Sequence, residues 1–455
     1  MNRIWPLGLL FSLVGVVLVY IAGGYYPIAL FFRIAGLLIL TFYALKKKSL
    51  TTWIMLSMIA GIEVGLDFPD FSQHLKVFSQ IFLRAVKMII APLLFATLVY
   101  GIAGHASLRQ IGRMGWKSLL YFEIVTTLAL FVGLAAIQFT GAGKGITPPP
   151  ASATDIPVMP DKKPKNLSEI VLDAFPENIA KSVYDNAVLQ VVVFSVLFGI
   201  GLSLTDEKYK APMISFVESL SEVMFKFTSV IMYMAPLGVG CAMAVTVGHM
   251  GLGILKNLFL LLFTLYGALI AFVLIVLLPV ALLFRVPLRR FVRALVEPVS
   301  VAFATTSSDA ALPKAISAME KLGVPRKIVS FVIPMGYSFN LDGTTLYLSL
   351  ATVFVAQAAG IQLTLDQQLT ILFTLMLTSK GVAGVPRASL VILIGTASSF
   401  NLPMWPIYLI LGIDELMDMA RTSVNVIGNC LATVVIARWE GEFVEHSESS
   451  YPDIG

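Results

Sequence analysis

The sequence predicts an all-α polytopic membrane protein, and three observations support this fold class. Hydrophobic residues make up 57% and charged residues 13% of the 455 residues, against roughly 45–50% and about 25% in soluble proteins. Apolar runs of about 20 residues, the length of a spanning helix, recur along the chain. Lys and Arg gather in short loops between these runs. A cytosolic enzyme, a nucleic-acid binder and a disordered scaffold are disfavoured, because a soluble protein of this composition would expose large apolar patches.

Neither the net charge nor the cysteines indicate a nucleic-acid partner or a metal site. The formal charge of +5 needs no nucleic acid to explain it, because excess Lys and Arg in a membrane protein usually lie in cytoplasmic loops. Cys241 and Cys430 both lie in apolar surroundings. Two cysteines cannot make a disulfide framework or a four-Cys zinc site. We therefore expect no cofactor, and Na⁺ is the only metal ion considered.

The first half of the chain predicts ordinary membrane spans. One basic residue precedes the first apolar run and no clear cleavage site follows it, so we expect a helix there and not a signal peptide. The polar segment 139–185 is typical of an extended surface loop. The predicted spans are 5–22, 28–46, 51–67, 78–103, 115–138, 186–204, 212–245 and 253–284.

Basic clusters predict the orientation of these spans. Alternating spans place three clusters on one side of the membrane and the 139–185 loop on the other. We therefore expect a multi-pass protein of the plasma (inner) membrane with both termini in the cytoplasm. The clusters are Lys46 to Lys48; Arg109, Arg113 and Lys117; and Arg285, Arg289, Arg290 and Arg293.

After residue 290 the apolar segments carry polar breaks. Segment 294–322 is broken near Thr305 to Asp309, and segment 367–403 near Ser379 to Pro386. Irregular backbone at membrane depth must face protein, water or a ligand. Broken segments in corresponding positions of two halves are typical of a transporter site at an inverted-repeat interface. We predict two re-entrant hairpins here; the alternative is a pair of kinked, packed helices.

The spans that alternate with these segments, 324–357 and 404–437, have polar centres. In the second of them Asp414, Asp418 and Arg421 share one helical face, which Asn425 and Asn429 extend. An ionised side chain at the centre of a membrane costs at least ~2.5–3.5 kcal/mol and marks a functional site by default. A guanidinium binds a carboxylate and an aspartate binds an ammonium, so this face fits an amino acid with an acidic side chain. The alternative is an ion pair without a ligand.

Two further acids lie inside predicted spans. Asp342 sits between Asn340 and Thr344 in the span 324–357. This oxygen-rich group suits a hard cation such as Na⁺, but it is equally consistent with a buried aspartate bonded to neighbouring hydroxyls. Glu123 lies within the span 115–138. It could carry a proton or bond to another helix.

At four motifs the chain resembles the dicarboxylate/amino acid:cation symporters, which include bacterial glutamate and aspartate transporters and mammalian excitatory amino acid transporters. The resemblance covers about residues 51–440. The motifs are Ser307-Ser308 before Leu312-Pro313, the segment Asn340 to Thr344, the segment Gly381 to Pro386, and Asp418 to Thr422 with Asn425.

The resemblance implies eight core helices and two hairpins with inverted repeats, assembled as a homotrimer of independently working protomers. Each protomer would have a static scaffold and a mobile transport domain that moves like an elevator. Residues 1–48 would be an extra N-terminal helix pair without a counterpart in that core. Residues 49–290 would be mostly scaffold, with 78–138 split between the two parts. Residues 291–440 would form the transport core, and 441–455 a cytoplasmic tail.

The resemblance also implies roles for individual residues. Arg421 would hold the side-chain carboxylate of the substrate, and Asp418 its amino group. The implied substrate contacts are Ser308, Thr344, Val385, Asp418, Arg421, Thr422 and Asn425. The implied cation-site positions, many acting through backbone carbonyls, are Gly336, Ser338, Asn340, Asp342, Ser379, Lys380, Val382, Asn425 and Asn429.

Several positions depart from the sodium-coupled members. Leu341 stands where those members usually have Met, and Asn429 replaces an aspartate that ligates a sodium. Phe122 and Val125 fall where a Tyr and a Thr help to bind another sodium in archaeal members. Thr306 stands where some members carry an arginine.

Each loss of an oxygen ligand weakens a sodium site, so the pattern favours H⁺ over Na⁺ as the coupling ion. A proton carrier needs a titratable group whose environment favours its neutral form. The proton-coupling candidates are Glu123, Asp342 and Asp309. Sodium coupling stays open as the alternative.

The leading function is therefore symport of glutamate or aspartate. A C4-dicarboxylate carrier is the runner-up, although such carriers tend to lack an aspartate at the position of Asp418. A neutral amino acid carrier would leave Arg421 without its partner. An intramembrane aspartyl protease would use Asp342 and Asp418, but the Gly-x-Gly-Asp signature is absent. A passive channel is the remaining option.

Overall fold

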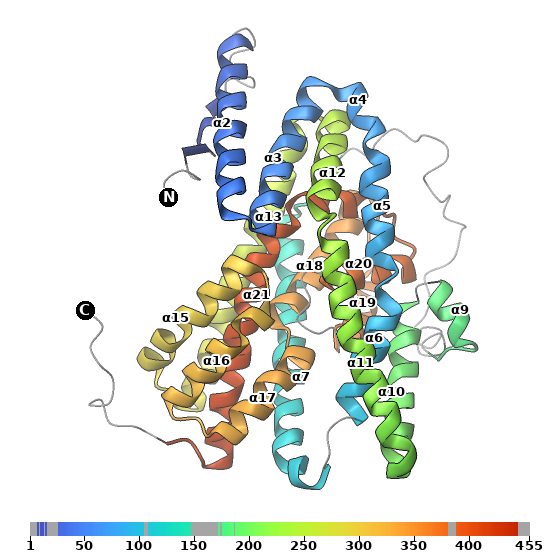
Figure 1. The fold of residues 1–455 in the computed structure, drawn as a ribbon, viewed down its shortest axis with the longest axis vertical. Helices are drawn as coiled ribbons and strands as arrows, with labels where there is room; N and C mark the ends of the chain where they lie inside the picture. The colour runs from blue at the N-terminus through green and yellow to red at the C-terminus, as the bar shows by residue number, and fades with distance from the viewer. Residues whose placement is uncertain are drawn as a thin grey trace.

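The computed structural model describes residues 7–8, 10–12, 14–15, 26–103, 108–146, 172, 175–185, 187–380 and 388–444. In these residues the regular structure is entirely helical (Figure 1). Six of the described helices are long and apolar enough to cross a membrane, or up to seven if the bent pair α11–α12 counts as one span. The all-α, multi-pass architecture expected from the sequence is confirmed.

The helices follow one another along the chain, most of them with short connections. They are α2 (Tyr26–Lys47), α3 (Leu50–Asp67), α4 (Pro69–His74), α5 (Lys76–Lys87), α6 (Ile90–Ala103), α7 (Leu108–Thr140), α9 (Ile179–Tyr184), α10 (Val188–Leu204), α11 (Glu207–Met232), α12 (Ala235–Met250), α13 (Gly253–Phe272), the π-helical turn η1 (Val273–Leu277), α14 (Leu278–Leu283), α15 (Leu288–Thr305), α16 (Ser308–Leu322), α17 (Arg326–Phe339), α18 (Asp342–Ala358), α19 (Leu365–Thr378), α20 (Ala388–Ser399) and α21 (Trp405–Glu440).

Prolines explain why several predicted spans are interrupted. The expected run 212–245 bends by 47° between α11 and α12, and Pro236 lies in the first turn of α12. The expected run 78–103 is divided into α5 and α6, with Pro92 in the first turn of α6. Proline lacks the backbone N–H and clashes with the preceding turn, so it begins a helix more readily than it continues one. Of the expected first span, 5–22, most lies outside the described residues.

The N-terminal helix α2 is attached to α3 by a buried ion-pair cluster. Arg33 is 2% exposed and pairs with Glu63, and its Nη2 atom lies 2.6 Å from Asp67 Oδ2. Phe31, Leu38 and the residues near them instead present an apolar face away from the protein. A helix with one buried arginine toward the protein and an exposed apolar face on the other side is suited to a bilayer edge.

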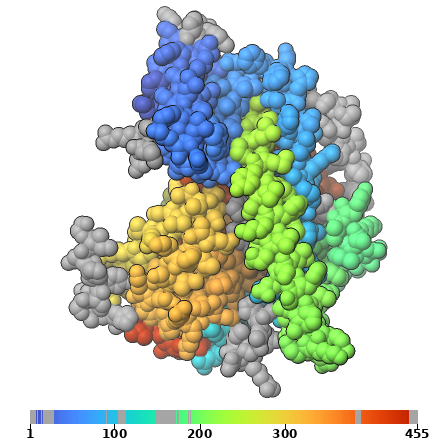
Figure 2. All heavy atoms as spheres, viewed as in Figure 1, coloured from blue at the N-terminus to red at the C-terminus, as the bar shows by residue number. Residues whose placement is uncertain are grey.

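The remaining helices pack as two groups. The first group contains α3 to α6 and α9 to α12, with its main contacts between α3 and α12 and between α6 and α10. The second group contains α7, α13 to α14 and α15 to α21, with its main contact between α7 and α18. Figure 2 shows α15 to α17 (yellow to orange) beside α11 and α12 (green) on one face of the molecule.

Close glycine contacts hold each group together internally. A Cβ atom at Gly61 of α3 would overlap the carbonyl of Gly240 in α12. Likewise, a Cβ atom at Gly133 of α7 would overlap the carbonyl oxygen of Leu346 in α18. The helix backbones therefore approach to a separation that only glycine permits, as in other membrane helix pairs.

The predicted break in segment 294–322 is a helical hairpin. Helices α15 and α16 pack against each other, and both contact α21. Thr306 at the tip has a left-handed backbone (φ 51°), and the Ser307 side chain accepts a hydrogen bond from the N–H of Ala310. In the second predicted hairpin, α19 and α20 are the two legs, and the tip at 381–387 lies outside the described residues.

Two of the basic clusters meet at the end of α21. Arg113 and Lys117 from the start of α7 pair with Glu440 at 2.6 and 2.5 Å. Arg438 donates a hydrogen bond to the carbonyl of Arg285. The second and third clusters therefore lie on one side of the protein, as the alternation of spans predicts.

Candidate substrate site

The site begins at a break between α17 and α18 that the sequence did not predict. The segment 324–357 was expected as one span, but α17 ends at Phe339 and α18 starts at Asp342. The N–H groups of Gly343 and Thr344 at the new helix start donate to Asn425 Oδ1 at 2.8 and 3.2 Å. Asn425 Nδ2 in turn donates to Thr344 Oγ1 at 2.9 Å. Asn425 of α21 therefore caps α18, because a helix start leaves N–H groups without internal partners.

Replacing Asn425 with alanine should destabilise the protein. The change leaves two buried N–H groups without an acceptor, and each such group costs about 1–3 kcal/mol. Thermal unfolding in detergent is expected to begin at a lower temperature than in Thr433→Ala, which removes one buried hydroxyl from the same helix. Equal melting temperatures for the two variants would contradict the capping role.

Arg421 is the centre of the charged group on α21. It is fully buried, and its Nε and Nη1 atoms donate to Asp418 Oδ1 at 2.7 Å and Asp414 Oδ1 at 3.0 Å. Its guanidinium carbon lies 4.2 Å from the centre of the Tyr347 ring. Thr422 Oγ1 also donates to Asp418 Oδ1, at 3.1 Å. These contacts hold the guanidinium in one plane and orientation, which a preorganised binding site requires.

The same contacts leave one nitrogen of the guanidinium, the buried Nη2 atom of Arg421, without a hydrogen-bond partner among the described residues. A planar carboxylate can accept parallel N–H bonds from Nη1 and Nη2 without displacing Asp414 or Asp418. The three charged side chains carry one positive and two negative formal charges, so an ammonium group beside Asp418 would balance the excess negative charge.

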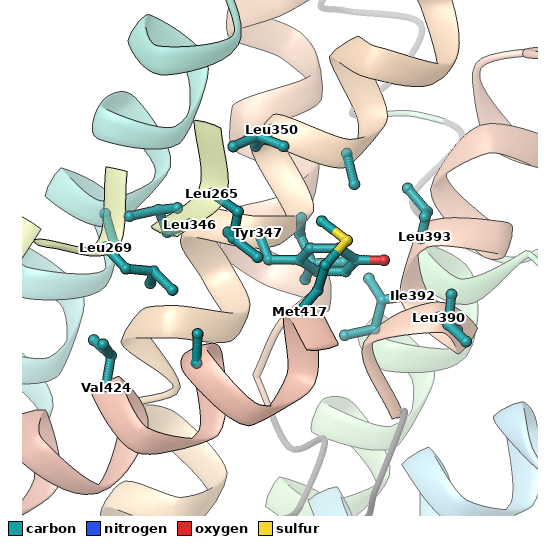
Figure 3. Packing of buried hydrophobic residues seen from close by; sticks show 14 of the residues in the cluster. Leu265, Leu269, Leu346, Tyr347, Leu350, Leu390, Ile392, Leu393, Met417 and Val424 are labelled. Atoms are coloured by element: carbon teal, nitrogen blue, oxygen red, sulfur yellow. The ribbon is translucent and has the colours of Figure 1, made fainter. Parts of the chain in front are cut away.

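Tyr347 is a site residue that the sequence reading missed. It lies three residues after Thr344, a spacing that places both side chains on one face of α18, and this spacing was the available signal. Its ring is buried against the Arg421 guanidinium. Figure 3 shows it beside Met417 of α21, with Ile392 and Leu393 of α20 nearby. The apolar surroundings exclude water and strengthen the charged contacts of Arg421.

A second polar cluster lies where the α17–α18 break faces α21. Asn340 Nδ2 lies 3.3 Å from Asp342 Oδ2 and 3.4 Å from Asn429 Oδ1. Asn340 Oδ1 and Asp342 Oδ1 are buried and have no hydrogen-bond partner among the described residues. A Cβ atom at Gly428 would overlap Asp342 Oδ2, so glycine makes room for this carboxylate. The oxygen atoms fit either a hard cation or a proton on Asp342.

The other expected cation-site and substrate positions lie on several elements. Gly336 and Ser338 occupy the last turn of α17, and Ser379 follows the end of α19. Ser308 is the buried first residue of α16, and in the described part of the chain no hydrogen bond joins its side chain to α21. Val382 and Val385 lie outside the described residues.

Of the three proton-coupling candidates, only Asp342 is fully buried within the protein. Asp309 is exposed in the first turn of α16. The side chain of Glu123 is 46% exposed and lies 3.2 Å from Lys380 Nζ. These positions do not test which of the three acids carries the proton, so that assignment stays a prediction. Within the described residues, no group of three His, Cys, Asp or Glu side chains could hold a metal ion.

Comparison with known proteins gives consistent matches over most of the chain. Residues 50–439 match a family model described as the sodium:dicarboxylate symporter family. A proton/sodium-glutamate symport protein of Geobacillus stearothermophilus is 39% identical over 414 residues, which cover 90% of this chain and 98% of the relative. A proton/glutamate-aspartate symporter of Escherichia coli is 38% identical over 419 residues, 89% of this chain and 96% of the relative. A C4-dicarboxylate transport protein of Bacillus subtilis is 39% identical over 401 residues, 88% of this chain and 95% of the relative.

Proposed function

Because this chain belongs to the sodium:dicarboxylate symporter family, whose members are transporters and not enzymes, we propose that it imports glutamate or aspartate, with protons as the favoured coupling ion. The observation that carries the substrate assignment is the buried Arg421 guanidinium, held between Asp414 and Asp418 with its Nη2 atom unpaired among the described residues. The side-chain carboxylate of the substrate binds that atom, and its ammonium group binds Asp418. The relatives named for glutamate and aspartate support this choice.

A C4-dicarboxylate carrier is the second candidate, because a relative of the same identity bears that name. Such a substrate would also satisfy Arg421 with one carboxylate. It has no ammonium group, however, and so nothing that can pair with Asp418 or offset the two aspartates beside Arg421. Glutamate and aspartate also carry two carboxylates, but their ammonium group is attracted to Asp418, so the amino acid is the better fit.

We further propose that the protomer works as an elevator, in which the second packing group moves against the first. The close contacts of α7 with α18 and of α3 with α12 support two internally rigid bodies. Since α13 contacts α7 and α21, the moving part would contain α7 and the continuous stretch from near residue 253 onward, which begins earlier than the boundary at 290 expected from the sequence. A homotrimer in the plasma membrane with cytoplasmic termini completes the proposal.

The coupling ion is tested with gradients imposed on proteoliposomes. An inside-alkaline pH step without sodium should drive accumulation of labelled glutamate by the unmodified protein. Asp342→Asn, which removes the fully buried candidate carboxyl group and cannot carry a proton, should still exchange substrate but not accumulate it against a gradient. Glu207→Gln, an exposed acid at the start of α11, is the matched control and should accumulate normally. Accumulation that requires a sodium gradient and ignores pH steps would show the proton assignment to be wrong.

A further inference from the structure

The Lys380 ammonium group lies in a cluster of oxygens that has the composition of a cation site. Its Nζ atom lies 2.7 Å from Thr126 Oγ1, 3.2 Å from the carbonyl oxygen of Phe339 and 3.2 Å from Glu123 Oε2. A lysine ammonium has three N–H donors, and three oxygens surround it here. The side chain is 14% exposed, so the protein covers most of the charged group.

The three oxygens come from two different helices, neither of which carries the lysine. Glu123 and Thr126 are one turn apart on α7, and Phe339 is the last residue of α17. Lys380 follows the end of α19, the first leg of the second hairpin. The ammonium therefore joins three elements that are distant in sequence.

The Phe339 carbonyl is available because α17 is broken. The last carbonyls of a helix have no internal N–H partner, and the helix dipole places partial negative charge at that end. In transporters with broken helices, unwound carbonyls and the C-terminal ends of half-helices bind the coupling cations. The end of α17 is such a position, and in this structure a lysine side chain occupies it.

We propose that Lys380 is a built-in cation: its ammonium group fills a monovalent-cation site made by Glu123, Thr126 and the Phe339 carbonyl, so that no free ion binds there. The inference rests on the proposed cation-coupled function. The resemblance implied that position 380 helps to bind a cation through its backbone carbonyl, whereas here the Lys380 side chain itself takes the place of the cation. Removing the ammonium leaves a carboxylate and two neutral oxygens, which together form ligands for a hard cation such as Na⁺.

The test is sodium binding measured without transport. Thermal unfolding of purified Lys380→Met is compared in sodium chloride and in choline chloride at equal ionic strength. A ligand that binds only the folded state raises Tm with concentration, so we expect a sodium-specific rise, on the order of a few degrees, beyond that of the unmodified protein. Lys380→Arg keeps the positive charge and should show no such gain. Lys380→Met/Thr126→Val, which removes one oxygen ligand, should lose most of it.

Two results would overturn the proposal: a Lys380→Met protein that responds to sodium no more than the unmodified protein, or a gain that survives unchanged in Lys380→Met/Thr126→Val. If Lys380→Met does not fold, Lys380→Gln, which also removes the positive charge but can still hydrogen-bond to the oxygens, takes its place and should show the same sodium-specific rise. A sodium response of the unmodified protein would count against proton coupling but leaves this comparison intact. The failure of the proposed function and the failure of this inference are therefore distinguishable.

Discussion

Replacing Arg421 with cysteine should lower glutamate and aspartate uptake by about 100-fold or more. Removing one partner of a buried ion pair costs about 3–5 kcal/mol, and each 1.4 kcal/mol is about tenfold in binding. Here the guanidinium is fully buried and pairs with both Asp414 and Asp418. The substrate carboxylate would lose the same buried partner, so we expect a loss of similar size in substrate binding, measured as initial uptake of labelled substrate in proteoliposomes.

The matched control for this variant is Arg293→Cys, which removes an exposed arginine from α15 and should leave uptake close to normal. A folded Arg421→Cys protein is recognised by a monodisperse profile in detergent and by new counterflow of a neutral amino acid such as serine. That gain is expected because the site no longer holds a guanidinium that needs a carboxylate. Undiminished aspartate uptake by Arg421→Cys would remove Arg421 from the substrate site.

Replacing Asp418 with asparagine should lower amino acid uptake by about 10-fold to 100-fold and lower succinate uptake much less. A hydrogen bond to a charged group contributes about 1.5–3 kcal/mol, and asparagine keeps the shape while removing the charge. Succinate has no ammonium group and does not use this contact. The ratio of glutamate to succinate uptake, measured in one vesicle preparation, is the informative quantity.

Asp414→Asn provides the comparison for Asp418, because Asp414 also pairs with Arg421, at 3.0 Å. It is expected to act only by positioning the guanidinium, so glutamate and succinate uptake should fall together. If Asp418→Asn also reduces both substrates by the same factor, Asp418 has the positioning role of Asp414 and does not bind the ammonium group.

Hydropathy was sufficient to predict the fold class and the long apolar runs, because the membrane demands such runs. The hairpin tip near Thr306 was also predictable from its polar residues. The break at residues 340–341 was not, since it depends on Asn425, which lies more than 80 residues away in sequence and caps the new helix start. Local sequence does not show which distant side chain will accept those hydrogen bonds.

The charged face of α21 could be predicted because helical spacing alone brings Asp414, Asp418 and Arg421 together. The partners contributed by other helices could not be predicted in this way. Tyr347 reaches Arg421 from α18, and Lys380 reaches Thr126 from the second hairpin. Both contacts result from tertiary packing, and each changes the chemistry expected at its site.

The central claim is that this protein accumulates an acidic amino acid at the expense of a cation gradient. The most direct measurement is the uptake of labelled glutamate, aspartate, succinate and serine into proteoliposomes, with pH and sodium gradients imposed separately. The account predicts accumulation of glutamate and aspartate above equilibrium under the pH gradient, little serine uptake, and collapse of accumulation when a protonophore is added. Uptake that stops at equilibrium under both gradients, or accumulation of succinate alone, would contradict it.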